Sequence, residues 1–330
     1  MCEYLNGIFS EFKNRCLNPR VLVVGDIMLD NYLYGEAYRL SPEAPVPVVN
    51  HTGQELMLGG CGNVIKNLVE FGISTGIISV IGRDTTGAII EKQLIDLAVD
   101  IKGLVKSHSR PSTEKMRIIS QNQQIVRFDR EATFDIDEME VSQLRKEFDL
   151  MILDYDLVLI SDYSKGVLTE NFCRYVISRS NELNKLVLVD PKISNFNKYS
   201  GAYLVKPNLA EAKLISGSQL ESVDDFLSAT NSIRSEHNIS AVVITMGSKG
   251  VFFNFGLYGK VDAHRVGVYD VSGAGDTFFA AMALCIILGV RLTDAVIFSN
   301  AAASIVIQKF GSQVTSIDNV LKFLNDERNI

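Results

Sequence analysis

The stretch DVSGAGDTF, residues 270–278, places a carboxylate after two glycines and ahead of a run of small and apolar residues. The run predicts a helix with Asp276 in its first turn, where free N–H groups favour an acidic side chain for stability alone. Gly273, Ala274 and Gly275 also leave these N–H groups bare for an anion. Phosphoryl transfer needs such donors, and it needs a carboxylate that takes the proton of the accepting hydroxyl.

A second glycine-rich stretch, GGCGN at residues 59–63, precedes another helical pattern. Gly59 and Gly60 would let a ligand approach the backbone, and Asn63 in the first helical turn could bind hydroxyl groups. An Asn near a helix start also arises for capping alone. The stretch is not the G-x-G-x-x-G dinucleotide fingerprint, and the chain has no G-x-x-x-x-G-K-[ST] loop. NAD-dependent chemistry is therefore disfavoured.

Short β-branched runs alternate with helical patterns, which predicts a parallel sheet covered on both faces, an α/β layered fold. The expected strands are 21–29, 76–82, 156–162, 185–190, 202–208 and 241–247. The expected helices are 61–72, 84–98, 137–150, 169–183, 221–236, 275–289, 292–309 and 315–326.

Polar residues collect after these predicted strands. They are Asp30, Asp162, Lys165, Lys192, Asn208 to Glu211, and Met246 to Lys249. Ligands of open α/β sheets bind beyond the carboxyl ends of the strands, so we expect the site there. TMGSKG, residues 245–250, suits a nucleotide contact or an ordinary hairpin turn equally well.

Residues 32–58 and 112–130 break the alternation with short, partly alternating segments. We expect a small sheet inserted into one domain that spans 1–330, acting as a lid, a dimer surface or both. The segments are VPVVN, QELML, EKMRIIS and QQIVRFD.

Composition narrows the class of protein. Hydrophobic residues make up 47% and charged residues 22% of 330 residues, as in a globular protein with an ample core. The net charge of −7 argues against a nucleic-acid partner. Five unpaired cysteines and no membrane-length apolar stretch lead us to expect a soluble, cytoplasmic protein that does not bind membranes.

The two glycine-rich stretches resemble the signatures of the PfkB/ribokinase carbohydrate kinases, in the right order over about 20–326. Five further segments together resemble the kinases of ADP-heptose synthesis: LSPEAPVPVV, NQQIVRFD, SDYSKGVLT, VDPK and KPNLAE. The resemblance implies a ribokinase-like three-layer α/β/α sandwich with an inserted β-sheet lid. It also implies ATP with Mg²⁺, and phosphorylation of D-glycero-β-D-manno-heptose 7-phosphate at O1 for lipopolysaccharide core synthesis. Some relatives also hold a monovalent cation, at positions matching Asp270 and Ser272.

The resemblance also assigns roles. Asp276 matches the general base and Gly273 to Gly275 the anion hole, while Asp30 and Asn63 match sugar contacts. Asn208 and Glu211 match the family's N-x-x-E element, which would organise the nucleotide phosphates and, through water, Mg²⁺. The nucleotide side as a whole comprises Asn208, Leu209, Ala210, Glu211, Thr245, Gly247, Ser248 and Lys249. Cys61 departs from the usual small residue of the first signature, and Ser272 from the usual threonine of the second.

A phosphorylated acceptor needs a cationic pocket, for which the sequence offers four candidates: Lys165, Lys192, Arg39 and Arg127. Each could equally be a surface charge. Lys192 is the first choice because VLVDPK places it directly after a strand, and Lys165 is the second.

Two other functions stay open. One is a kinase of the same fold for fructose, ribose or a deoxy-gluconate, and the other is a non-catalytic sugar-binding protein. The intact Asp276 and the Asn208/Glu211 pair argue against the second. In bifunctional relatives a nucleotidyltransferase domain follows the kinase, and because this sequence stops at Ile330 we expect the kinase part alone. We also expect a homodimer formed through the lid.

Overall fold

The structure is a computed structural model that describes residues 2–14, 17–121, 123–309, 311 and 313–326. Among these residues, nine strands form one large sheet and four form a smaller one. The large sheet comprises β1 (Arg20–Gly25), β4 (Ser74–Gly82), β5 (Asp100–Ser107), β8 (Leu157–Ser161), β9 (Leu186–Asp190), β10 (Leu204–Val205), β11 (Ala241–Thr245), β12 (Val251–Asn254) and β13 (Tyr258–Val261). Their order is β13-β12-β11-β10-β9-β8-β1-β4-β5. The strands from β11 to β5 pair in parallel, whereas β12 and β13 join antiparallel at one edge.

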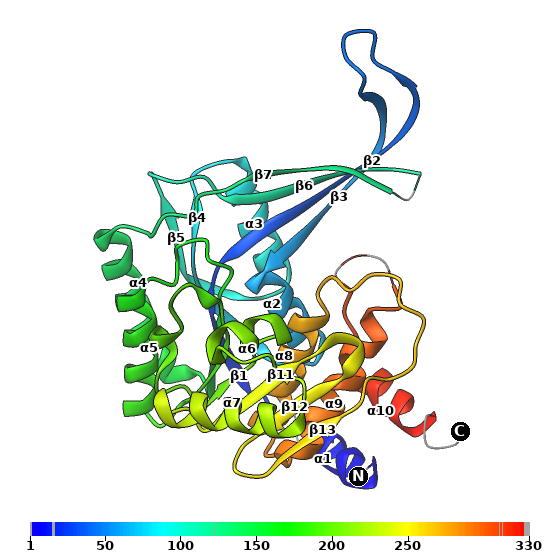
Figure 1. Ribbon diagram of the computed structural model, residues 1–330. Helices are drawn as coiled ribbons and strands as arrows, with labels where there is room; N and C mark the ends of the chain where they lie inside the picture. Colours follow the sequence, from blue (N-terminus) through cyan, green and yellow to red (C-terminus); the bar gives the residue numbers. More distant parts are fainter. Residues whose placement is uncertain (1, 15–16, 122, 310, 312, 327–330) are drawn as a thin grey trace.

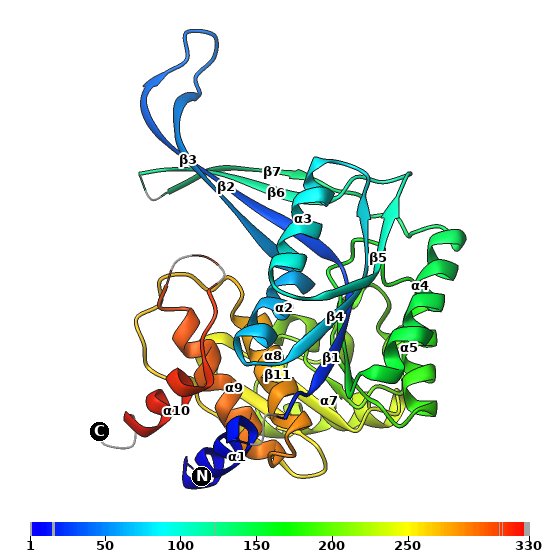
Figure 2. The same cartoon turned by 180° about the vertical axis from the view of Figure 1, so that it is seen from behind.

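Helices cover both faces of the large sheet (Figures 1 and 2). Pleating sends alternate residues of a strand to opposite faces. Val21 and Val23 of β1 join the core beneath α1 (Cys2–Asn14), α2 (Cys61–Glu70), α3 (Thr85–Asp96), α8 (Ala274–Ile287), α9 (Leu292–Val306) and α10 (Ile317–Asp326). Leu22 and Val24 join the opposite core, beneath α4 (Glu138–Met151), α5 (Glu170–Glu182), α6 (Leu209–Ser216) and α7 (Val223–Glu236). The 3₁₀ turns are η1 (Ile152–Asp154), η2 (Ile193–Tyr199) and η3 (Gly247–Lys249). This is the predicted three-layer α/β/α sandwich.

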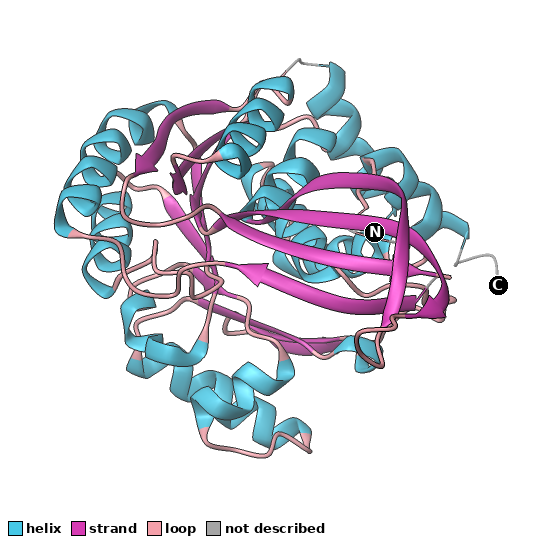
Figure 3. Ribbon diagram, turned by 90° about the horizontal axis from the view of Figure 1, so that it is seen from above, coloured by secondary structure: helices cyan, strands magenta, loops and turns pink. Residues whose placement is uncertain are grey.

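The smaller sheet is the predicted insertion, and we call it the lid sheet. It consists of β2 (Ile27–Leu40), β3 (Pro47–Gly60), β6 (Thr113–Ser120) and β7 (Gln123–Arg130), in the order β3-β2-β6-β7. It stands above the carboxyl ends of the large sheet, and the outer part of the β2–β3 hairpin projects well beyond the body (Figures 1 and 2). Figure 3 looks down on the molecule from the side of the lid sheet. The lid sheet therefore brings residues from two distant stretches of the chain over the expected ligand edge.

Some predicted elements were wrong in detail. The run 21–29 is not one strand, because the chain leaves the large sheet at Asp26 and enters the lid sheet as β2. Asp26 is buried at this break, and its carboxylate accepts backbone N–H bonds from residues 163, 165 and 167 in the loop after β8. The predicted segments 46–50 and 54–58 are not two strands, because residues 47–60 form the single strand β3. Strands β5 and β13 and the helices α1 and α6 were not predicted, whereas β12 is the strand that a hairpin turn at TMGSKG requires after it.

The structure bears on two expectations from composition, the lack of a membrane-spanning segment and the unpaired cysteines. Within the described residues no helix is long and apolar enough to cross a membrane. Cys61, Cys173 and Cys285 are buried free thiols. Cys16 lies outside the described residues.

Candidate active site

Asp276 lies where the sequence predicts it, in the first turn of α8 and 7% exposed. Gly273 adopts a left-handed conformation with φ 76° and begins the helix without a side-chain cap. The rest of α8 is apolar and buried in the core, which fixes the helix start against the sheet edge. The first N–H groups of α8 and the carboxylate of Asp276 therefore share one place at the carboxyl ends of the strands.

Two side chains donate hydrogen bonds to the Asp276 carboxylate, one to each oxygen. Nδ2 of Asn63, at the start of α2, lies 2.8 Å from Oδ2. The hydroxyl of Tyr163, in the loop after β8, lies 2.6 Å from Oδ1. Asn63 was predicted as a sugar contact, and its buried Oδ1 has no partner among the described residues. Tyr163 was not predicted as a site residue, although SDYSKG includes the end of a predicted strand on the ligand edge.

The surroundings of Asp276 have opposing effects on the pKa of its carboxyl group. Burial raises the pKa of the carboxyl, and the hydrogen bonds from Asn63 and Tyr163 and the charge of Lys206 lower it, with a net shift upward. The Lys206 ammonium is buried and pairs with Asp190 at 3.1 Å. Burial in turn raises the pKa of Asp190 to about 6. A base with a raised pKa accepts a proton more readily than a solvated aspartate does.

A cavity of about 2020 Å³ opens in front of this helix start. Gly273, Ala274, Gly275 and Asp276 line it together with Lys206. A Cβ added to Gly275 would lie 3.6 Å from Nζ of Lys206, so the lysine is close to the helix N-terminus. Uncapped N–H groups and a buried ammonium beside them suit an anion such as a phosphoryl group. Sequence reasoning did not single out Lys206.

Most residues predicted for the nucleotide line the same cavity, on what we call the donor side: Asn208, Leu209, Glu211, Thr245, Gly247, Ser248 and Lys249. Ala210 lies exposed in the same turn. Asn208 and Glu211 form a capping box at the start of α6, in which each side chain accepts from the backbone of the other at 2.9 Å. Glu211 also receives Nζ of Lys192 at 2.7 Å. Asn208 and Glu211 therefore stabilise the start of α6, in addition to any role that they have in binding a metal.

The acceptor side, as we call it, lies under the lid sheet. Asp30 of β2 pairs with Arg117 of β6 at 2.5 Å. Gly59 allows this aspartate close to β3, because a Cβ there would lie 2.4 Å from its Oδ2. Gly60 has φ 58°, and a Cβ on it would meet the Asp26 carbonyl oxygen at 2.4 Å. Both glycines therefore have a packing reason in addition to the ligand contact predicted for them.

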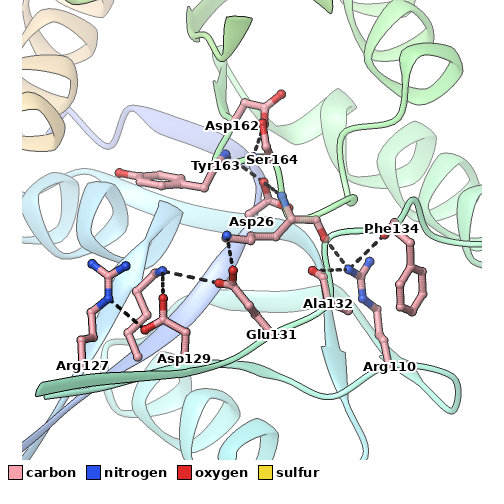
Figure 4. A network of polar contacts seen from close by, with 12 residues as sticks. Asp26, Arg110, Arg127, Asp129, Glu131, Ala132, Phe134, Asp162, Tyr163 and Ser164 are labelled. Atoms are coloured by element: carbon pink, nitrogen blue, oxygen red, sulfur yellow. Dashed lines mark hydrogen bonds and ion pairs between the residues drawn. The ribbon is translucent and has the colours of Figure 1, made fainter. Parts of the chain in front are cut away.

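Figure 4 shows a chain of ion pairs between the lid sheet and the loop that carries Tyr163. Arg127 binds Asp129 at 3.0 Å, and Lys115 bridges Asp129 and Glu131 at 3.2 and 3.4 Å. Lys165 binds Glu131 at 2.7 Å. The structure thus brings the predicted Lys165 and Arg127 together, with Lys115 between them.

The other two predicted cations lie elsewhere. Lys192 is on the donor side with Glu211. Arg39 is exposed near the outer end of β2, where it is paired in register with Val48 of β3. Neither belongs to the ion-pair chain under the lid sheet, so their assignment to the acceptor phosphate stays a prediction.

The fold matches that of known sugar kinases. Ribokinase from Arabidopsis thaliana, solved with ribose and ATP, has a TM-score of 0.72 at 19% identity, covering 93% of this chain and 99% of that one. Phosphofructokinase-2 from Escherichia coli, solved with potassium, has a TM-score of 0.77 at 20% identity, covering 94% and 99%. At these identities the likeness shows a ribokinase-like fold and no more.

The sequence identifies the family. The profile of the pfkB family carbohydrate kinases matches residues 18–319, and the chain belongs to that family. It is therefore a carbohydrate kinase, as predicted. It is 40% identical over 307 residues to the "Bifunctional protein HldE" of a Nitratiruptor species, covering 93% of this chain. It is 36% identical to the protein of that name from Sulfurimonas denitrificans, covering 94%. The chain spans 65% of the length of each of these relatives.

Proposed function

We propose that this kinase transfers the γ-phosphoryl group of ATP to O1 of D-glycero-β-D-manno-heptose 7-phosphate and forms the 1,7-bisphosphate. One observation carries the phosphoryl-transfer part. A buried carboxylate, held by two donors, lies at an uncapped helix N-terminus in front of a large cavity. The choice of a heptose rests on the sequence resemblance and on the similarity to the bifunctional relatives. ADP-heptose and lipopolysaccharide core synthesis, in the cytoplasm, is the setting that this choice implies.

In the proposed reaction Asp276 takes the proton of the accepting hydroxyl. The hydroxyl oxygen forms a bond to the γ-phosphorus while the bond from that phosphorus to the leaving oxygen of ADP breaks. The N–H groups of Gly273 to Asp276 and the Lys206 ammonium stabilise the charge of the phosphoryl group in transit. Asn63 would orient the sugar, because its unpartnered Oδ1 can accept from a hydroxyl beside the base.

The donor side fits a nucleotide with a divalent cation. Asn208 and Glu211 would hold Mg²⁺ through water, since carboxylate and amide oxygens are its preferred protein ligands and it retains several waters. When bound, the ion neutralises phosphate charge. Among the described residues no group of three acidic, His or Cys side chains is placed to bind a metal ion directly. Thr245, Gly247, Ser248 and Lys249 would line the nucleotide. A monovalent cation beside Asp270 stays part of the proposal.

The acceptor phosphate is proposed to bind under the lid sheet. Lys165 and Arg127 were predicted for it, and Lys115 lies between them with 16% of its side chain exposed. Their carboxylate partners Asp129 and Glu131 hold these cations in place. Burial acts to raise the pKa of Glu131, but Lys165 and Lys115 outweigh it and hold that pKa below its ordinary value. A phosphate dianion that leaves water needs cationic partners. Lys165, Lys115 and Arg127 would supply them on the acceptor side.

A homodimer through the lid sheet completes the proposal. Exposed apolar side chains gather on its strands, among them Tyr38, Leu40, Val126 and Phe128, which are 47–72% exposed. Such a surface favours a protein partner, and a second copy of the chain would cover it. Sedimentation at micromolar concentration tests this, and Phe128→Glu should shift a dimer toward monomer. A wild-type protein that sediments as a monomer would remove this part of the proposal.

The main test measures ADP release from ATP with a panel of acceptors: heptose 7-phosphate, fructose, fructose 6-phosphate, ribose and a deoxy-gluconate. We expect the highest kcat/KM with heptose 7-phosphate. If an unphosphorylated hexose exceeds every sugar phosphate, the heptose assignment fails and a different sugar kinase takes its place. If no acceptor stimulates ADP release, the proposed phosphoryl transfer to these acceptors fails, and a binding measurement with the same panel tests the alternative of a non-catalytic sugar-binding protein.

A further inference from the structure

The loop 162–167, between β8 and α5, is held in place by two buried carboxylates. Asp26 accepts the backbone N–H groups of Tyr163 at 2.8 Å, Lys165 at 3.1 Å and Val167 at 3.2 Å. Asp162 accepts the N–H of Ser164 at 2.7 Å, and it also binds Lys198 at 2.5 Å and the Tyr199 hydroxyl at 2.6 Å. The path of the loop is thus fixed from two sides.

The shape of this loop leaves little freedom. Ser164 and Gly166 have φ angles of 54° and 87°, which L side chains rarely adopt. A Cβ on Gly166 would lie 2.0 Å from the carbonyl oxygen of Phe134. Backbone strain of this kind persists only where the surroundings over-determine it. The one side chain that this loop extends onto the expected base is that of Tyr163, 2.6 Å from Oδ1 of Asp276.

We propose that Tyr163 is a positioning residue for the phosphoryl transfer: its hydroxyl holds the Asp276 carboxylate ionised and aimed at the acceptor, and Asp26 fixes Tyr163. The inference rests on the proposed role of Asp276 as base. A carboxylate has about four lone-pair sites, so the bonds from Asn63 and Tyr163 leave room for the acceptor hydroxyl. An O–H···O⁻ bond of this length is in the charge-assisted range, which favours the ionised form.

Tyr163 is suited to be a permanent donor. Burial and the neighbouring Asp276 charge raise the pKa of its phenol well above the ordinary value, so it keeps its proton at any pH at which the enzyme works. Nζ of Lys192 lies 5.9 Å from its ring centroid, which is within cation–π range. Tyr163 therefore lies in the loop that Asp26 holds and contacts both the expected base, Asp276, and the donor-side cation, Lys192.

Other groups also face Asp276 and contribute to its titration. Lys206 after β10 acts to lower the pKa of Asp276, and Asp30 of β2 acts to raise it. The charge of Asp276 in turn acts to raise the pKa of Cys61 and Lys66 of α2 and of Asp190 of β9. The change Tyr163→Phe leaves all of them in place and removes one hydroxyl, so a change in the titration of Asp276 reports on that hydrogen bond.

The experiment compares Tyr163→Phe with a matched control, Tyr175→Phe. The Tyr175 hydroxyl also lies 2.6 Å from a carboxylate, Asp149, but in the helical layer on the opposite face of the large sheet. The pKa of the Asp276 carboxyl is measured by NMR on protein with ¹³C-labelled aspartate, its signal being the one absent from Asp276→Asn. The acid limb of kcat/KM is measured with any acceptor that the wild type phosphorylates.

We expect Tyr163→Phe to raise the pKa of Asp276 by about one to two units, since it removes a hydrogen bond to a charged group. The acid limb should move to higher pH by the same amount, with kcat/KM about 10- to 100-fold lower below it and recovering above it. Tyr175→Phe should change neither. An Asp276 titration that does not move, or one that moves equally in the control, overturns the proposal. A loss of kcat/KM that is uniform with pH does so too, because it shows a purely structural role. The NMR arm needs no turnover, so it decides even if the proposed reaction fails.

Discussion

The donor and acceptor sides of the candidate site are built in different ways. On the donor side, Asn208 and Glu211 are three residues apart and cap one helix, and Lys192 reaches Glu211 across 19 residues of sequence. On the acceptor side, Arg117 and Asp30 are 87 residues apart, and Lys165 and Glu131 are 34 apart. The first set lies in segments that follow neighbouring strands of the large sheet. In the second set, the Asp30–Arg117 pair links two strands of the lid sheet, and the Lys165–Glu131 pair ties the end of that sheet to the loop after β8 (Figure 4).

This difference suggests how a kinase of this fold can change its sugar. Helix caps and strand-end loops belong to the frame that packs the core, so the donor side has little freedom to vary. The ion pairs of the acceptor side lie within the lid sheet or tie it to the loop after β8, where one changed charge alters the contacts available to a sugar without disturbing a helix. We therefore expect substitutions to affect either the nucleotide or the sugar, except at the junction where Asp276 and Tyr163 meet.

The largest effect is expected at that junction. Asp276→Asn should lower kcat by roughly two to four orders of magnitude, the usual effect of removing a general base. The amide keeps the shape and can still accept one of the two hydrogen bonds, so ATP affinity and folding should change little. Single-turnover kinetics and nucleotide binding by calorimetry measure the two quantities separately. Turnover near the wild-type value in a folded variant would remove Asp276 from the mechanism.

The same contrast explains what the sequence could predict. The layered α/β fold, the lid sheet and the place of Asp276 follow from hydrophobic periods and glycine-rich helix starts, which are local signals. The partner of Lys192 could not be predicted, because its choice of Glu211 depends on how η2 and α6 pack. The roles of Tyr163 and Lys115 could not be predicted, because they depend on contacts between residues of different helices, strands and loops. The split at Asp26 was missed because an apolar run does not show where a chain changes sheets.

The second prediction concerns Asp26, which holds the acceptor-side loop. Burial, with a smaller effect from Asp162, raises its pKa to about 6. The folded state therefore binds more protons than the unfolded state between about pH 4 and 6, so this group's contribution to the free energy of unfolding decreases as pH rises through that range. The total change is about 3 kcal/mol for a shift of about two units.

Urea unfolding of the wild type and of Asp26→Asn at pH 4, 5, 6 and 7 isolates this contribution. The difference in the free energy of unfolding, wild type minus variant, should fall between pH 4 and 6 and stay constant above. A difference that does not vary with pH would contradict the raised pKa. If the variant does not fold, the ¹³C titration of Asp26 in the wild type decides the same point.

The third prediction compares two lysines, one on each side. Lys165→Ala should raise KM for the sugar phosphate about tenfold, as loss of one charged contact worth about 1.4 kcal/mol would, and leave KM for ATP nearly unchanged. Lys192→Ala should do the reverse, because its partner is the donor-side Glu211. This reverses the order in which the sequence ranks the two residues. Steady-state kinetics with each substrate varied in turn measures both, and a tenfold rise in KM for the sugar phosphate in Lys192→Ala would restore the original ranking.

The smallest effect is expected from Glu211→Gln. The amide oxygen of glutamine can still accept the backbone N–H of Asn208, because a capping box works with Glu or Gln, so α6 should keep its start. What is lost is one negative charge beside the proposed metal site and the charged half of the pair with Lys192. We expect the Mg²⁺ concentration for half-maximal activity to rise several-fold while KM for the sugar phosphate stays constant. Glu140→Gln is the matched control, since Asp137 and Glu140 form the corresponding capping box at the start of α4. An unchanged Mg²⁺ dependence in Glu211→Gln with an altered KM for the sugar phosphate would place Glu211 on the acceptor side, and the two sides would then not be separable as the contacts indicate.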